Sequence, residues 1–253
     1  MGTRTMTSTL LLMFFLGIGA SFLGTLAGGG GLITLPVMLF LGIPIQTGIA
    51  TNKFASGLGS FSSVLYTLRR KKASNQFYLF LIGLSLVGGA IGALVTSMLP
   101  EKLMNIVALI LLVFALGLTL KKKKWANEQQ QSQSMRIKGW KRFLPLGIGI
   151  YDGGFGPGSS TFAIIYFLEQ GQNYIESVQL ARVLNFGSCL SAFIIFYITG
   201  HFKWEVALTM AAASIIGNQV GLRVAKFISI KLARTILLSV SCLLILQIVV
   251  NMI

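Results

Sequence analysis

The chain has 253 residues, of which 54% are hydrophobic and only 11% are charged, and its formal net charge is +15. Its mean hydropathy of +0.79 is too high for an ordinary soluble domain, so the composition indicates an all-α polytopic protein that crosses the cell (plasma) membrane several times. Lys and Arg lie mostly in short loops at segment ends, where they set orientation, so the expected surroundings are a lipid bilayer and not nucleic acid.

Eight apolar segments are candidates for membrane spans, because a spanning helix needs roughly 20 apolar residues. They cover residues 10–42, 47–68, 75–97, 103–120, 143–168, 174–198, 204–222 and 235–252. The first and the fifth segments are each broken by a glycine-rich stretch. These segments leave almost no room for a soluble domain.

The first break consists of Gly28, Gly29, Gly30 and Gly31, with Pro36 following. Consecutive glycines weaken a helix by about 1 kcal/mol each, which predicts two shorter helices, 10–27 and 32–41, joined by an unwound turn. Unwound backbone at membrane depth requires protein or a water-filled cavity around it. A half-helix that begins near Gly31 would direct free N–H groups into such a cavity, an arrangement that suits an anion. The alternative is that the glycines only permit close helix packing.

The second broken segment indicates an internal duplication. An offset of 129 residues places Gly24, Gly29, Gly88 and Gly92 on Gly153, Gly158, Gly217 and Gly221. We therefore predict two homologous halves of about four segments each, 1–120 and 143–253. The polar, basic stretch 121–142 between them is expected to be a cytoplasmic linker.

The basic residues also predict how the halves are oriented. If each broken segment enters and leaves on one side, the halves are inverted, with sixteen basic loop residues inside and three outside. If every segment crosses once, the division is fourteen to five. The positive-inside rule therefore favours inverted repeats, a recurrent transporter design.

Polar residues deep in the segments are candidates for a binding site, because an intramembrane charge costs at least a few kcal/mol. Lys53 and Arg182 each lie early in the helix that follows a broken segment, and a cation from each half near two helix N-termini would bind an anion. The alternative for each is that its side chain snorkels to the interface. The neutral donors expected beside them are Asn52, Asn185 and the second break at Gly158, Ser159 and Ser160, whereas Asn218 and Gln219 are expected to pack helices.

Asp152 is the one acidic residue expected to lie deep. Burial disfavours the charged form of a carboxylate, so Asp152 could bind and release a proton during transport. It could instead cap a helix end or pair with Arg182.

An intramembrane serine hydrolase is a further alternative, with Ser159 or Ser160 as nucleophile and His201, the single histidine, as base. His201 lies in the polar turn 200–203, which is expected at a membrane edge. It is therefore badly placed to act on a buried serine, and we do not expect an enzyme. The sequence contains neither a metal-ligand cluster nor a phosphate loop, and no cofactor is expected. Cys189 and Cys242 predict no disulfide framework.

Two stretches carry a family resemblance: GTLAGGGGLITLP with GIATN in the first half, and GIYDGGFGPGSS in the second. They resemble the glycine signatures of the TauE/SafE-like sulfite exporter family, which is linked to 4-toluene sulfonate uptake permeases. Ser159 and Ser160 replace the last two glycines of the second signature, and Ile165 stands where a proline is expected.

The resemblance implies a secondary transporter that exports a small anion, such as sulfite, sulfoacetate or a related organosulfur or organic anion, and we expect coupling to protons. The alternative is a transporter of a cation or a neutral metabolite. The sequence leaves homo-oligomer formation open.

Overall fold

A computed structural model describes residues 3–68, 75–121 and 139–224, together with 227, 232, 235–236 and 238–243. The basic loop 69–72, most of the predicted linker 121–142 and most of the predicted segment 235–252 lie outside the described residues. The helices are α1 (Thr3–Ala27), α2 (Gly31–Phe40), α3 (Ile45–Leu68), α4 (Asn75–Ser97), α5 (Glu101–Lys121), the 3-10 helix η1 (Gly139–Phe143), α6 (Leu144–Gly154), α7 (Ser159–Glu169), α8 (Tyr174–Ile198) and α9 (Trp204–Val224).

The prediction of an all-α polytopic membrane protein is confirmed. Among the described residues, three stretches are long and apolar enough to cross a bilayer by length and composition: Ser8–Ala27, Gln76–Ser97 and Tyr174–Ile198. Both broken segments form two helices, as predicted, with breaks between α1 and α2 and between α6 and α7. Pro36 does not end its helix, because α2 continues to Phe40.

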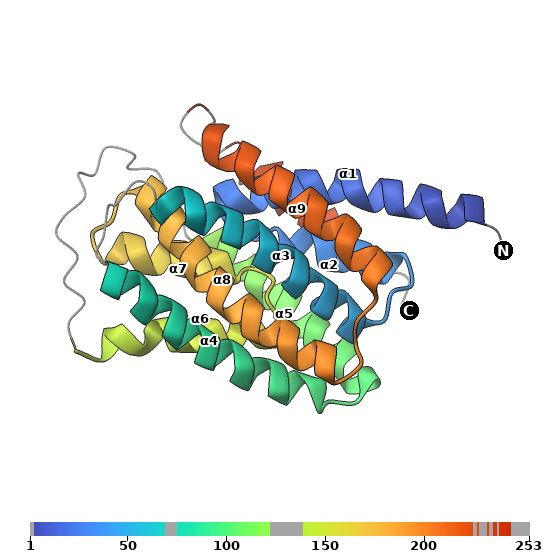
Figure 1. Ribbon diagram of the computed structural model, residues 1–253, viewed down its shortest axis with the longest axis horizontal. Helices are drawn as coiled ribbons and strands as arrows, with labels where there is room; N and C mark the ends of the chain where they lie inside the picture. Colours follow the sequence, from blue (N-terminus) through green and yellow to red (C-terminus); the bar gives the residue numbers. More distant parts are fainter. Residues whose placement is uncertain are drawn as a thin grey trace.

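The two broken segments turn back at the centre of the bundle from opposite ends (Figure 1). The N-terminus of α1 and the C-terminal end of α2 lie toward the right of this view, whereas α6 starts and α7 ends on the left. The long helices α3 and α8 run in opposite directions. These directions are the ones that inverted halves require, while the homology of the halves stays a prediction.

Glycines hold each broken segment against a helix of the other half. On α4, a Cβ added to Gly92 would lie 2.6 Å from the backbone nitrogen of Gly154 in α6. On α9, a Cβ added to Gly221 would lie 2.9 Å from Cβ of Thr25 in α1. The 129-residue offset places Gly92 on Gly221 and Thr25 on Gly154, so the two contacts occupy corresponding positions in the two halves. Such close helix contacts need small residues in a membrane, and they place both breaks in the interior.

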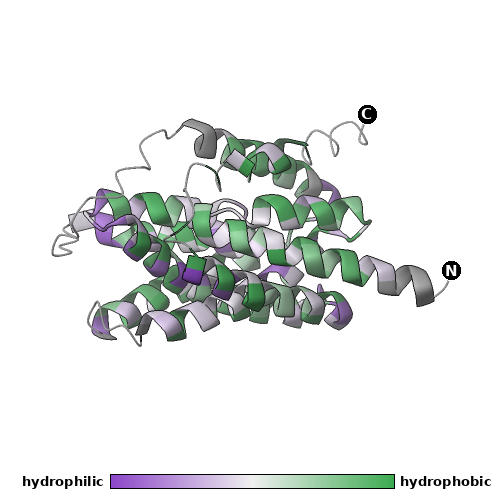
Figure 2. Cartoon of the chain, turned by 90° about the horizontal axis from the view of Figure 1, so that it is seen from above, coloured by the Kyte–Doolittle hydropathy of each residue, from purple (hydrophilic) through white to green (hydrophobic). Residues whose placement is uncertain are grey.

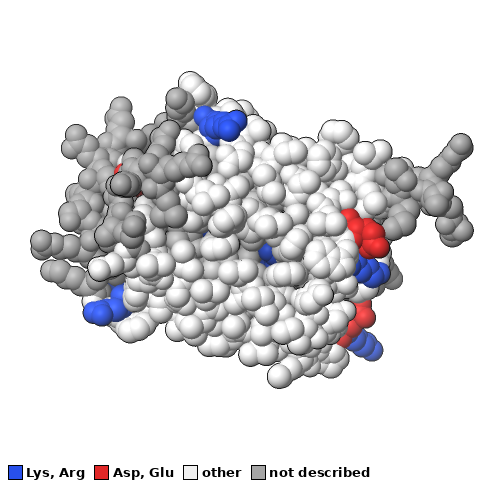
Figure 3. Space-filling model, viewed as in Figure 1, with Lys and Arg blue, Asp and Glu red and all other residues white. Residues whose placement is uncertain are grey.

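The outer surface fits a bilayer around the middle of the bundle. Hydrophilic residues gather mainly toward the helix ends (Figure 2). On the face in Figure 3, most charged side chains lie toward its two ends, and the band between them is uncharged except for a small basic patch near the middle. Large apolar side chains of the helices are exposed, including Phe15, Leu79 and Ile110. An exposed apolar surface of this extent is expected where lipid is the solvent.

The orientation of the halves can be tested with single cysteines placed at exposed positions, in a protein whose natural cysteines are replaced by serine. Inverted halves place Met98→Cys and Lys203→Cys on the outside, and Trp140→Cys and Glu169→Cys in the cytoplasm. A membrane-impermeant maleimide applied to intact cells should label only the first two. Labelling of Met98→Cys together with Glu169→Cys, but not of Lys203→Cys, would contradict the inverted arrangement.

Candidate functional site

The two breaks contact each other in the centre of the protein. Gly28 has a φ of +68°, and the hydroxyl of Thr161 in α7 donates to its carbonyl oxygen. A Cβ on Gly28 would lie 2.7 Å from the backbone nitrogen of Thr161, and one on Gly31 would lie 3.1 Å from Cα of Pro157. Only glycine combines this backbone conformation with so close an approach.

The start of each half-helix leaves backbone N–H groups free. Within the described chain, the amides of Gly29, Gly30 and Gly31 donate to no acceptor, and neither does the amide of Ser160. Free amides at helix N-termini, together with the positive ends of the helix dipoles, favour an anion.

A cavity of about 40 Å³ lies between the breaks, with room for about three water molecules. Of the predicted site residues, it is lined by Gly29, Gly30, Gly31, Asn52, Lys53, Asp152, Gly158, Ser159, Ser160, Arg182 and Asn185. Gly28 supports the turn but does not line the cavity. Eleven of the twelve candidates, drawn from α2, α3, α6, α7, α8 and the two breaks, therefore lie around one space.

The predicted deep carboxylate is paired with a cation from the other half of the chain. Nζ of Lys53 lies 3.2 Å from Oδ1 of Asp152 and also donates to the backbone carbonyl of Asp152. Lys53 is only 1% exposed and Asp152 only 3%. Lys53 therefore does not snorkel to the interface, and Asp152 pairs with Lys53 and not with Arg182.

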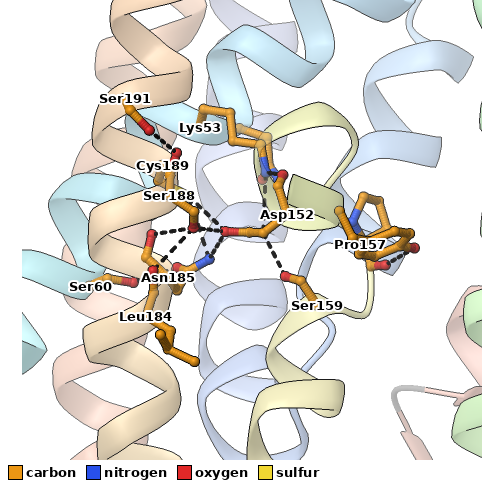
Figure 4. A network of polar contacts seen from close by, with 12 residues as sticks. Lys53, Ser60, Asp152, Pro157, Ser159, Leu184, Asn185, Ser188, Cys189 and Ser191 are labelled. Carbon is orange, nitrogen blue, oxygen red and sulfur yellow. Dashed lines mark hydrogen bonds and ion pairs between the residues drawn. The ribbon is translucent and has the colours of Figure 1, made fainter. Parts of the chain in front are cut away.

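Four more side chains donate to the carboxylate of Asp152 (Figure 4). Ser159 donates to Oδ1 over 2.6 Å. Asn185 donates to Oδ2 over 3.0 Å, and its amide is oriented by a hydrogen bond from Ser60. Ser188 and the thiol of Cys189 also reach Oδ2. Such a network stabilises a buried carboxylate because its lone pairs have donors.

Arg182 has no such partner. It is 6% exposed, one of its terminal nitrogens donates to the backbone carbonyl of Gly24, and its Nε has no hydrogen-bond partner. Among the described residues, the ion pair of Lys53 with Asp152 is the one salt bridge found. Arg182 thus lines the cavity without an acidic partner, and its Nε hydrogen is not used in a hydrogen bond.

The charges that line the cavity therefore do not balance. Lys53 and Arg182 contribute two positive charges and the ionised Asp152 one negative charge. A buried charge without a counter-ion costs several kcal/mol. An anion in the cavity would remove that cost, whereas a cation would increase it.

Sequence reasoning missed other lining residues: Ser21, Gly24, Thr34, Ser56, Gly156, Cys189, Ser214 and Asn218. Helical spacing could have found some of them, because Ser56 lies one turn after Lys53 and Cys189 one turn after Asn185. Asn218, expected to pack helices, accepts a hydrogen bond from Thr25 and donates to Ser214, and it also borders the cavity.

The two residues of the alternative enzyme hypothesis, Ser159 and His201, do not line the same cavity. Ser159 donates its hydroxyl to Asp152, whereas His201 lies between α8 and α9 and does not line the cavity. In the described part of the chain, no three His, Cys, Asp or Glu residues are grouped as metal ligands.

Comparison with known proteins places this architecture in a family. The family model described as sulfite exporter TauE/SafE matches residues 13–248. A probable membrane transporter protein of Sinorhizobium, ORF9, is 34% identical over 92% of this chain and 89% of its own length. A probable membrane transporter protein of Haemophilus influenzae is 31% identical over 84% and 83%, and YfcA of Escherichia coli K12, with the same description, is 31% identical over 93% and 88%.

Gly28→Ala tests the contact between the breaks. The substitution adds a Cβ beside Thr161 and forces a non-glycine residue to a φ of +68°, so we expect a loss of about 1–3 kcal/mol of stability or more from the clash. Gly19→Ala is the matched control, because a Cβ there meets nothing within 4 Å. Thermal unfolding in detergent should show a lower melting temperature only for Gly28→Ala, and equal melting temperatures would contradict the packing.

The buried ion pair can be tested by neutralising its members singly and together. Lys53→Met leaves the carboxylate of Asp152 without its counter-ion and should cost about 3–5 kcal/mol. Adding Asp152→Asn should restore much of the loss, since no unpaired charge then remains from this pair. The measurement is the midpoint of thermal unfolding, and a double variant no more stable than Lys53→Met would show that the two groups are not coupled.

Proposed function

The chain belongs to the TauE/SafE sulfite exporter family and is a membrane transporter, and from this premise we propose that it is a secondary transporter that exports a small anion through the central cavity. The observation that carries the proposal is the unpaired, buried Arg182 beside the free amides of two half-helices. A charge-assisted hydrogen bond in a poorly hydrated site is stronger than one in water, so Arg182 would be the main anchor of the anion.

The size and donors of the cavity support a small oxyanion as its substrate. The volume of about 40 Å³ suits an ion of a few heavy atoms. Ser160 and Asn52 line the cavity beside Arg182, and their hydroxyl and amide groups can donate to several oxygens of one ion. Sulfite and small sulfonates offer such oxygens, as do short carboxylates. The net positive charge argues against a cation.

We also propose that Asp152 carries the coupled proton. Its carboxylate lines the same cavity as Arg182, so its charge acts directly on a bound anion. Intramembrane carboxylates paired with a cation recur in proton relays of transporters. Of the acidic residues whose surroundings are described, Asp152 alone borders the cavity.

The function is tested by tracer flux in proteoliposomes that contain the purified protein. The panel consists of sulfite, sulfate, thiosulfate, sulfoacetate and short carboxylates, with choline and glycine betaine as cationic and net-neutral solutes. We expect flux of one or more small oxyanions, sulfite included, and none of choline. Flux of choline without flux of any anion would contradict the proposal.

Arg182→Gln should reduce the flux of sulfite about tenfold to a hundredfold, because a hydrogen bond to a charged group contributes about 1.5–3 kcal/mol. Lys203→Gln is the matched control, since it removes a cation that lies exposed at the end of the bundle. Detergent gel filtration checks that both variants fold. Undiminished flux in a folded Arg182→Gln would show that Arg182 does not hold the anion.

A further inference from the structure

We infer that Lys53 becomes a second anion ligand when Asp152 is protonated, so that a proton and the anion bind together and cross the membrane in the same direction. The inference rests on the proposed function and adds to it the sign of the coupling. Its starting point is the state that the structure shows, in which the carboxylate of Asp152 is the counter-ion of Lys53.

In this state Lys53 is unavailable to a substrate. Its Nζ lies 3.2 Å from Oδ1 and also donates to the backbone carbonyl of the same residue. Both side chains line the cavity that Arg182 lines. A proton on Asp152 would neutralise the carboxylate, and the charge of Lys53 would then face the cavity without an internal counter-ion.

The hydrogen bonds around Asp152 allow the carboxyl group to be protonated in place. A protonated oxygen needs an acceptor, and a hydroxyl can both donate and accept. Oγ of Ser188 contacts Oδ2 but also lies 3.1 Å from the carbonyl oxygen of Leu184 and 3.2 Å from that of Asn185. Ser188 can therefore turn its hydrogen to its own helix and accept the proton of Asp152.

The side chains that surround Asp152 include no second carboxylate that could take up the proton in its place. Lys53 approaches from α3, Ser159 from α7, and Asn185, Ser188 and Cys189 from α8. Arg182 of α8 lies at the same cavity. On α6 itself, the hydroxyl of Tyr151 donates to the carbonyl oxygen of Pro157 and not to Asp152. None of these neighbours is a second carboxylate.

The direction of coupling follows from the charges. An ionised Asp152 repels an anion in the shared cavity, whereas a protonated Asp152 does not. Proton binding therefore raises the affinity for the anion, and by linkage the anion raises the affinity for the proton to the same extent. Two ligands that favour each other's binding are carried together, so export would be driven by the gradient of the anion itself and opposed by an inward proton gradient.

The test measures [35S]sulfite and protons in the same proteoliposomes, with a pH-sensitive dye in the lumen and the membrane potential clamped. At alkaline pH sulfite is fully deprotonated, so its own titration releases no proton. We expect the lumen to acidify as sulfite enters through the wild-type protein. Alkalinisation, or sulfite entry without a change of pH, would overturn the inference while leaving the proposed function intact.

Two variants test whether Asp152 is the residue that carries the proton. Asp152→Asn should carry one proton fewer per sulfite and should lose the pH dependence of sulfite affinity, which for one linked proton reaches at most about tenfold per pH unit. Glu205→Gln is the matched control, because this carboxylate is exposed on α9, and it should keep the wild-type ratio. An unchanged ratio in Asp152→Asn would overturn the inference.

If Asp152→Asn does not fold, the wild-type measurement alone tests the inference: acidification of the lumen during sulfite entry supports it, and alkalinisation or no pH change overturns it. No flux of sulfite through the wild-type protein would count against the proposed function itself, and the inference would fall with it.

Discussion

The unequal charge of the central cavity is the constraint on which the rest of the structure depends. Lys53, Asp152 and Arg182 all lie buried around one space, and only the first two neutralise each other. A lone buried cation in a membrane protein is costly. The fold offsets part of that cost through backbone carbonyls, such as that of Gly24 on Arg182, and an anion would offset the remainder.

The glycine breaks explain how such a site can exist at membrane depth. Each break ends one half-helix and starts another, and Gly29, Gly30 and Gly31, whose amides are free, line the cavity. Close contacts at Gly92 and Gly221 hold each broken segment against the other half of the chain. Gly31 both packs closely against Pro157 and lines the cavity, so the two interpretations of the glycines are not exclusive.

The sequence predicts the helices and most of the candidate site, because apolar runs determine the former and intramembrane polar residues are rare. It could not choose the partner of Asp152, since Lys53 and Arg182 occupy similar places after the two breaks and the choice depends on how α3 and α8 pack. Ser56 and Ser214 were missed because small polar residues are common at packed helix faces. Helical spacing from Lys53 could have found Ser56, whereas the place of Ser214 at the cavity is visible only once the α9 helix lies beside α3.

The central claim is that the junction of the breaks is an anion site anchored by Arg182. The most direct test is anomalous diffraction from crystals grown with selenite, a heavier analogue of sulfite. The account predicts one anomalous peak beside Arg182, between the starts of α2 and α7, placed so that an oxygen of selenite lies about 3 Å from a guanidinium nitrogen. Selenite peaks confined to the surface of the protein, with the cavity free of anomalous density, would contradict it.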